Sequence, residues 1–256
     1  MNEAPRRAIV TGAASGLGRA CVEMLREAGC AVAGIDLQAN GIEAEHFGVC
    51  DVSDIESMAS AVAQAVSALG GLDGAVHCAG VFPDQVVPLH SVPPELWERT
   101  IAVNLSGSFA LARAVLPELI ATSGALVLTA SVTAQQPLPG AVAYAASKAG
   151  VVALARVAAL EYAHLGVRVN AVSPGWMETA MAAPALTRPS VRERIEQTIP
   201  SGRVATAAQV AATIRFLLSE DAGPLTGQDI VVDGGLSISA MSGRDGVAAA
   251  WQRSAE

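Results

Sequence analysis

The chain has 256 residues, 52% of them hydrophobic and 16% charged, which is enough for one α/β domain or two small ones. Its net charge of −8 and the lack of a basic run argue against nucleic-acid binding. No uninterrupted apolar run reaches the ~18 residues that cross a bilayer, and Arg6-Arg7 leads into a strand instead of the apolar core of a signal peptide. We therefore expect no membrane association and a cytoplasmic protein.

The cysteines and histidines indicate neither disulfides nor a metal site. No CxxC spacing occurs, which favours free, buried thiols in a reducing cytoplasm. The four cysteines all lie in the first third of the chain: Cys21, Cys30, Cys50 and Cys78. The four histidines are scattered, so we expect no bound metal.

The N-terminal segment has the order of a dinucleotide-binding unit. Ala8–Val10 forms a short apolar strand, residues 11–18 form a glycine-rich turn that opens a helical pattern, and Ala31–Ile35 forms a second strand. Glycines let the backbone approach a pyrophosphate, and the helix N-terminus offers free N–H groups. Asp36, eighteen residues past Gly18, suits a carboxylate that binds the adenosine ribose hydroxyls.

Predicted strands and helices alternate along the rest of the chain. The strands are expected over 47–50, 72–78, 125–131, 167–172 and 229–232. The helices are expected over 54–69, 95–119, 143–164 and 207–219. This alternation, with no linker or repeat, predicts one Rossmann-type domain over residues 1–256, with a doubly wound parallel sheet of about seven strands and helices on both faces.

Tyr144 and Lys148 form the most informative pair in the sequence. Lys148 is the only lysine, and Tyr144 precedes it by four residues, so both lie on one face of the predicted helix. A nearby ammonium lowers the pKa of a phenol towards neutral pH, as general acid–base catalysis requires. Taken alone, the spacing also fits a surface tyrosine beside a solvated lysine.

Together the motifs resemble the short-chain dehydrogenase/reductase family over roughly residues 6–235. The turn matches the family's TGxxxGxG, and residues 174–179 match its PGxxxT. Ser131 lies thirteen residues before Tyr144, as in the family. The resemblance implies that four residues form the catalytic set: Asn104, Ser131, Tyr144 and Lys148.

The resemblance also gives each of these residues a role. Tyr144 would exchange the proton of the substrate hydroxyl, and Ser131 would orient the substrate oxygen. Lys148 would hold the nicotinamide ribose and lower the pKa of Tyr144, while Asn104 would help to hold a water that links Lys148 to solvent.

The cofactor is expected to be NAD. In the family an acid at the end of the second strand accompanies NAD, whereas a 2′-phosphate is received by basic residues in the glycine turn or after that strand. Residues 13–15 and 37–38 include no basic residue, and Asp36 would repel a phosphate. The expected cofactor contacts are Gly12, Ser15, Gly16, Leu17, Gly18, Asp36, Leu37, Asp51, Val52, Ala79, Gly80, Tyr144, Lys148, Pro174, Gly175, Met177 and Thr179.

Two places in the chain carry open alternatives. Asp51 would contact the adenine by resemblance, but it could also cap the following helix, as could Ser53 or Asp54. His77-Cys78 stands where the family usually has Asn-Asn. The loss of two amides concerns local stability more than chemistry, and His77 is expected to be a hydrogen-bonded structural residue.

The substrate is expected to be a mainly apolar secondary alcohol or ketone. Residues 180–201 have mixed polarity and three prolines, which predicts a long loop that serves as a substrate lid. The expected substrate contacts are Ser131, Thr133, Leu138, Tyr144, Trp176 and Met181. The tail, 236–256, would either pack on a neighbouring subunit or be partly disordered.

These features predict an NAD-dependent oxidoreductase that acts on CH–OH groups. Two alternatives remain: a 3-oxoacyl-acyl-carrier-protein reductase and a non-catalytic NAD-binding regulator. The first needs a basic surface for its acidic carrier, which Arg188, Arg192 and Arg194 near the lid could provide. By resemblance we expect a homotetramer or homodimer that packs through the helices at 95–119 and 143–164.

Overall fold

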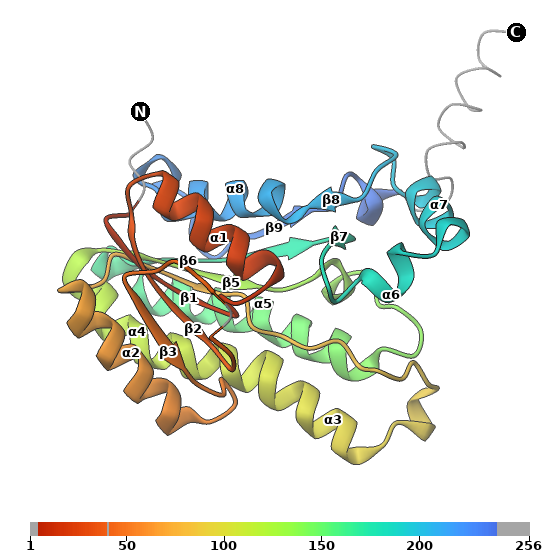
Figure 1. Ribbon diagram of the computed structural model, residues 1–256, viewed down its shortest axis with the longest axis horizontal. Coiled ribbons are helices and arrows are strands. Elements are labelled where there is room, and N and C mark those ends of the chain that lie inside the picture. The colour runs from red at the N-terminus through yellow and green to blue at the C-terminus, as the bar shows by residue number, and fades with distance from the viewer. Residues whose placement is uncertain (1–4, 40, 240–256) are drawn as a thin grey trace, which may run out of the picture.

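One sheet of seven parallel strands organises the computed structural model, which describes residues 5–39 and 41–239 (Figure 1). The strands are β1 (Arg7–Thr11), β2 (Ala31–Asp36), β3 (His46–Val49), β4 (Gly74–His77), β5 (Ala125–Thr129), β6 (Arg168–Pro174) and β9 (Asp229–Val232). Their spatial order is β3-β2-β1-β4-β5-β6-β9. The predicted single-domain, doubly wound Rossmann-type sheet is confirmed.

Helices cover both faces of this sheet (Figure 1). α1 (Gly16–Glu27) and α8 (Ala207–Leu218) pack on one face, and α2 (Ile55–Leu69), α4 (Gly107–Thr122) and α5 (Val142–Tyr162) pack on the other. Side chains alternate along each strand between the two resulting cores. On β1, Ile9 enters the core under α4 and α5, whereas Ala8 and Val10 enter the core under α1 and α8.

The chain reverses its direction of winding between β1 and β4. β1 pairs with β2 on one side and with β4 on the other, so the crossovers on the two sides diverge. In such sheets, ligands bind in the crevice outside the carboxyl ends of the strands at this switch point.

The helix predicted over 95–119 is interrupted in the middle. α3 (Pro94–Ile101) and α4 are joined by a π-helical segment, Ala102–Ser106, which contains Asn104. A π turn inserts an extra residue into the helical ladder, a feature that sequence periodicity does not reveal and that is frequent at functional sites. The prediction of one regular helix is therefore wrong at this point.

The region predicted to be a loop, 180–201, contains two helices. They are α6 (Ala183–Leu186) and α7 (Pro189–Thr198), and each has a proline in its first two positions. Proline suits the start of a helix because its missing N–H would have no partner there. The prolines thus begin helices here, and the irregular loop expected from them is not found.

Two short strands hold this region at its ends. β7 (Met177–Glu178) pairs with β8 (Ala205–Thr206), so the chain returns to the point from which the two helices depart. Leu186, Ile199 and Val204 form a small third hydrophobic cluster under the helices. We call residues 179–204 the lid.

Short 3₁₀ segments occupy Leu89–Ser91, Val132–Ala134, Ala163–Leu165, Glu220–Ala222 and Leu236–Ile238. Most of the predicted tail, 240–256, lies outside the described residues.

Two helical stretches, Pro94–Thr122 and Val142–Leu165, are long and apolar enough to cross a membrane by length and composition alone. Both pack against the sheet, and 50% and 44% of their most apolar windows are buried inside the protein. Core helices of this kind have such composition without any membrane. Their outward side chains include Phe109, Val157 and Leu160, which are 46%, 53% and 83% exposed.

Candidate active site

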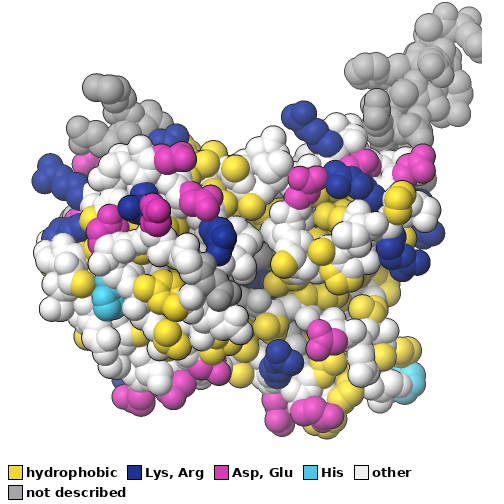
Figure 2. Space-filling model, viewed as in Figure 1, with side chains coloured by type: hydrophobic (Ala, Val, Ile, Leu, Met, Phe, Trp, Pro, Cys, Tyr) yellow, Lys and Arg dark blue, Asp and Glu magenta, His cyan; other side chains and the backbone are white. Residues whose placement is uncertain are grey.

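A cleft of about 1250 Å³ lies at the carboxyl ends of the strands, between the sheet and the lid. All predicted cofactor and substrate contacts line it, and of the predicted catalytic residues only Asn104 does not. Figure 2 shows hydrophobic side chains on this face, towards the α6–α7 region, with charged side chains around them. The cleft is large enough for a dinucleotide together with a small second molecule.

Two glycines of the turn, Gly12 and Gly18, leave no room for a side chain. Gly12 has a φ of +66°, and a Cβ there would lie 2.6 Å from the backbone nitrogen of Ala79. A Cβ at Gly18 would overlap the carbonyl oxygen of Gly12. Ser15 caps α1 without a side-chain capping bond, so its hydroxyl and the first N–H groups of the helix remain available to a ligand. This cradle fits a pyrophosphate.

Asp36 ends β2 beside this turn. Its Oδ2 accepts a hydrogen bond from the backbone N–H of Ala14 at 2.8 Å. Arg19 lies on the other side of Ala14, and its Nε and Nη2 donate to the Ala14 carbonyl oxygen at 3.1 and 2.9 Å. A cation therefore does lie at the turn, although residues 13–15 and 37–38 contain none. The signal was in the sequence, because Arg19 directly follows Gly18.

The structure identifies the residue that caps α2. Asp54 Oδ1 accepts from the N–H groups of Glu56 and Ser57, both at 3.0 Å, so Asp54 is the N-cap. Asp51 instead accepts from the backbone N–H and hydroxyl of Ser53, at 2.9 and 2.7 Å, and lines the cleft beside Val52. Asp51 therefore does not cap the helix.

Tyr144 lies half-buried near the start of α5 and points into the cleft. Its ring packs edge-on against Phe82, with centroids 5.0 Å apart and planes at 63°. Such edge-to-face contacts are favourable and fix the ring plane. Phe82 follows Ala79-Gly80 closely, but nothing in the sequence indicated that it contacts Tyr144.

The electrostatics of Tyr144 differ from the expectation. Burial raises its pKa above the usual 10, and a hydrogen bond with Ser131 acts in the opposite direction. The Lys148 Nζ lies 5.7 Å from the ring centroid. Desolvation of the phenolate thus outweighs the stabilising contact, so the expected lowering of the pKa by Lys148 is not found.

Lys148 is almost fully buried at the floor of the cleft. Its Nζ donates to the carbonyl oxygen of Thr129, at the end of β5, at 2.7 Å. Burial lowers the pKa of Lys148 from 10.5 to about 8. An ammonium has three donors, so two remain for a ligand hydroxyl or the phenol side of the cleft.

Asn104 lies behind the cleft wall. Its Oδ1 accepts from the backbone N–H of Val81 at 2.8 Å, and its Nδ2 donates to the Val81 carbonyl oxygen at 3.0 Å and to Ser147 Oγ at 3.1 Å. A Cβ at Gly80 would lie 3.2 Å from Asn104 Oδ1 and 3.6 Å from Lys148 Nζ. Asn104 thus braces the backbone beside Lys148, while the predicted water relay stays a prediction.

His77 occupies the sheet beneath these residues. It is fully buried, and its Nδ1 shares a hydrogen bond of 2.9 Å with Thr11 Oγ1 at the start of the glycine turn. Its Nε2 is buried without a hydrogen-bond partner among the described residues. Burial, assisted by Lys148, lowers the pKa of His77 to about 3, so the imidazole is neutral. This bond fits the expected structural role.

The substrate end of the cleft is mainly apolar. Leu138 and Met181 line the cleft and are 41% and 47% exposed. Trp176 also lines the cleft and packs against the small hydrophobic cluster of the lid. Thr133 adds a polar group, because its Oγ1 is buried without a partner among the described residues. Ser131 Oγ also accepts from the Thr133 N–H at 3.2 Å.

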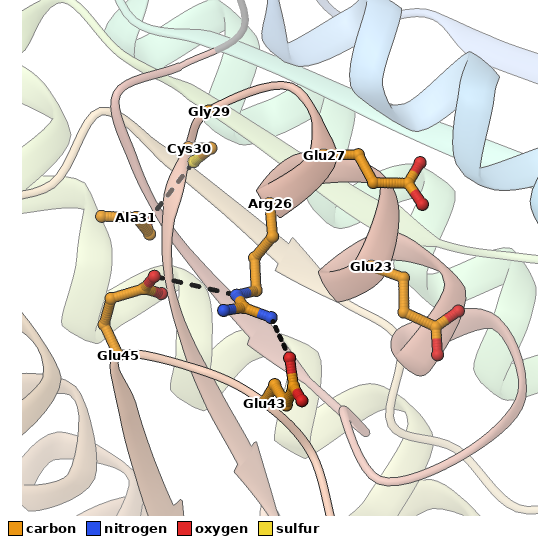
Figure 3. Close-up of a pocket in the computed structure, with 8 residues that line it drawn as sticks. All are labelled: Glu23, Arg26, Glu27, Gly29, Cys30, Ala31, Glu43 and Glu45. Carbon is orange, nitrogen blue, oxygen red and sulfur yellow. Dashed lines mark hydrogen bonds and ion pairs between the residues drawn. The ribbon is translucent and has the colours of Figure 1, made fainter.

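A second hollow, of about 590 Å³, lies at the other end of the strands, where α1 ends and β2 begins. Figure 3 shows that Arg26 reaches between Glu43 and Glu45, at 3.1 and 3.7 Å. The thiol of Cys30 is unreactive there because burial raises its pKa to about 12. No group of three or more potential metal ligands occurs among the described residues. The chemistry therefore gathers in the first cleft.

Known proteins of the same kind match this chain along most of its length. Residues 12–237 match the family described as Enoyl-(Acyl carrier protein) reductase. The chain is 37% identical to D-threitol dehydrogenase of Mycolicibacterium smegmatis, covering 90% of this chain and 92% of that protein. It is 34% identical to the NAD-dependent glycerol dehydrogenase of Listeria innocua, covering 90% and 93%.

The fold agrees with solved structures. Ligand-free aldohexose dehydrogenase of Thermoplasma acidophilum superposes with a TM-score of 0.87 at 29% identity, covering 93% of this chain and 97% of that one. A short-chain type dehydrogenase/reductase from Mycobacterium ulcerans gives a TM-score of 0.87 at 28% identity, covering 93% and 92%. The chain is an oxidoreductase of CH–OH groups and belongs to the short-chain dehydrogenase/reductase family.

Proposed function

We propose that the protein interconverts a secondary alcohol and a ketone on a mainly apolar small molecule, with NAD as the cofactor and Tyr144 as general acid and base. The observation that carries the proposal is the convergence of Ser131, Tyr144 and Lys148 on one cleft with the glycine turn. The related dehydrogenases of threitol and glycerol support alcohol chemistry.

The residues present fit a dinucleotide. The side-chain-free turn at Gly12 and Gly18 and the open N-terminus of α1 would hold the pyrophosphate. Asp36 would receive the adenosine ribose, and Lys148 the second ribose. When bound, the nicotinamide supplies the hydride acceptor or donor.

The choice of NAD rests on Asp36, whose carboxylate would repel a 2′-phosphate. Arg19 at the same turn is a cation that would attract that phosphate. Since Arg19 already binds the Ala14 carbonyl oxygen, we assign the preference to Asp36. The relative from Listeria innocua, named as NAD-dependent, agrees with this assignment.

In alcohol oxidation, the Tyr144 oxygen accepts the proton of the substrate hydroxyl, and Ser131 donates a hydrogen bond to the substrate oxygen as charge develops on it. Phe82 holds the tyrosine ring in plane, and Lys148 supplies the positive field. In ketone reduction, Tyr144 returns the proton to the oxygen. The apolar walls at Leu138 and Trp176 exclude water from this exchange.

A reductase of acyl groups on an acidic carrier is the second candidate, favoured by the description of the matching family. Such a carrier needs a basic surface at the entrance. Of the arginines on α7, Arg192 is already paired with Glu178 and Glu196 at 2.6 and 2.9 Å. This pairing and the chain's net charge of −8 favour a small-molecule substrate.

We further propose that the protein is cytoplasmic and forms a homotetramer or homodimer. The outward apolar side chains of α4 and α5, including Phe109 and Leu160, would be covered by the same helices of a second copy. Sedimentation equilibrium tests this assembly, and a monomer would contradict it.

The function is tested by incubating the protein with NAD⁺ or NADP⁺ and a panel of secondary alcohols, polyols and acyl-carrier β-hydroxyacyl groups, while following absorbance at ~340 nm. We expect turnover with NAD⁺ and an uncharged alcohol that carries apolar substituents. Activity confined to the carrier-bound substrate would support the second candidate instead.

A further inference from the structure

The lid helix α7 has almost no hydrophobic anchor of its own. None of its ten residues, Pro189–Thr198, is buried. The small hydrophobic cluster of the lid uses Leu186, Ile199 and Val204, which lie before and after α7, and α7 contributes only the partly buried Ile195. A surface helix usually gains its position from a buried apolar face, so α7 requires another fastening.

Arg192 provides one fastening, beside the hydrogen bond from Ser239 Oγ to the Thr198 carbonyl oxygen at 3.2 Å. The Arg192 Nη2 lies 2.6 Å from Glu178 Oε1, and its Nε lies 2.9 Å from Glu196 Oε1. Hydrogen bonds between a guanidinium and carboxylates are short and directional. The pair with Glu196 stays within α7, whereas the pair with Glu178 joins α7 to a separate element.

Glu178 belongs to the segment that faces the cofactor side of the cleft. It lies in β7 between Met177 and Thr179, both of which line the cleft, and β7 pairs with β8. The side chain of Thr179 reaches the glycine turn, because a Cβ at Gly16 would lie 3.6 Å from its Cγ2. One chain segment thus contacts the nucleotide turn on one side and the lid helix on the other.

We infer that Arg192 is a positioning residue that, through Glu178, ties the lid helix to the cofactor-binding segment, so that cofactor and lid are ordered together. The inference rests on the proposed function for its kinetic consequence but not for the tie itself. α6, which α7 follows, brings Pro184 and Ala185 to the cleft wall, so a loosened α7 alters the walls of both sites.

Kinetics test the coupling. Arg192→Gln and Glu178→Gln should each raise KM for NAD⁺ and for the alcohol about two- to five-fold with little change in kcat, as expected for a half-exposed ion pair. The double variant should be no worse than either single variant. Glu196→Gln is the matched control, because it removes the partner within α7 and keeps the tie to Glu178. Salt at about 0.5 M should raise KM of the wild type but not of Arg192→Gln.

A structural role alone predicts a different result. It would lower Tm in Arg192→Gln while leaving both KM values at those of Glu196→Gln, and this outcome would overturn the inference. Additive effects in the double variant would overturn it as well.

Limited trypsin digestion tests the tie without activity. Glu178→Gln keeps every arginine, so cleavage after Arg192 and Arg194 in the lid should be faster than in the wild type and in Glu196→Gln, and NADH should protect the wild type more. Equal cleavage in the three proteins would refute the tie. If no protein, the wild type included, oxidises any alcohol, the proposed function fails while this digestion still decides the tie.

Discussion

The Nζ of Lys148 lies 5.7 Å from the ring centroid of Tyr144 and donates to the Thr129 carbonyl oxygen at 2.7 Å. One donor of the ammonium thus anchors the lysine to the end of β5, and the ammonium lies close to the tyrosine ring. A compact ammonium on a slender stem fits this buried position, whereas the planar guanidinium of arginine is wider and directs its donors differently.

Lys148→Arg should therefore lower kcat/KM by at least about a hundredfold although it keeps the charge, because the donors are displaced from both the ribose and the phenol side. NADH binding, measured by fluorescence titration, should weaken as well. Arg156→Lys, an exposed position two turns later on α5, is the control and should retain activity. A fully active Lys148→Arg enzyme would contradict the placement of Lys148.

Ser131→Ala should shift the pH dependence of alcohol oxidation. The hydrogen bond with Ser131 opposes the raising of the Tyr144 pKa by burial, so its loss leaves the pKa higher. Less phenolate then exists at any given pH, and the rising limb of log(kcat/KM) should move to higher pH. Ser173→Ala is the control: it removes a buried hydroxyl bonded to Asp229, away from Tyr144, and should leave the limb in place.

His77→Asn should make the unfolding free energy less sensitive to mild acid. The pKa of His77 is about 3 in the folded protein, against 6.5 for the free group. Between these pH values the unfolded chain binds a proton at His77 and the folded protein does not. The wild type should therefore lose about 2 kcal/mol of unfolding free energy between pH 7.5 and pH 5, with no effect of this group above pH 7.5.

Urea denaturation at the two pH values measures this difference. Asparagine does not titrate and still offers Thr11 a hydrogen-bonding partner. The His77→Asn variant should therefore lose about 2 kcal/mol less unfolding free energy than the wild type between pH 7.5 and pH 5. His164→Asn, at an exposed turn after α5, should behave as the wild type does. An equal acid sensitivity in His77→Asn and the wild type would show that His77 is not the cause.

Asp36→Asn should shift cofactor preference towards NADP⁺. The change removes the charge that repels a 2′-phosphate but keeps an oxygen that accepts from the Ala14 N–H, and Arg19 lies at the same turn. The ratio of kcat/KM for NADP⁺ to that for NAD⁺ should rise at least about tenfold, as expected for unit charges a few ångströms apart. Asp51→Asn should weaken both cofactors alike, and an unchanged ratio in Asp36→Asn would place the selectivity elsewhere.

Much of the fold and the site could be predicted from the sequence because short-range patterns determine both. Apolar strands alternate with helical periods, and the predicted cofactor contacts outside α5 lie at the end of a strand or at the start of a helix, so the parallel sheet brings them to one edge. Tyr144 and Lys148 needed only helical spacing to share a face.

The remaining features depend on contacts between distant segments. The π segment at Asn104 arises where the side chain meets the backbone of Val81, and no local period encodes it. The edge-on contact of Phe82 with Tyr144 and the pair of Arg192 with Glu178 join residues 62 and 14 positions apart. The direction of the Tyr144 pKa depends on burial, which only the three-dimensional structure gives.

Tyr144→Phe is the most direct test of the account, because it removes one oxygen and keeps the ring that packs on Phe82. With NAD⁺ and the best alcohol of the panel, kcat should fall by at least about a thousandfold, while the NADH dissociation constant stays within about twofold. Tyr162→Phe, which changes the only other tyrosine on the same helix, should keep full activity. Turnover by Tyr144→Phe at a rate near that of the wild type would contradict the assignment of Tyr144 as the general acid and base.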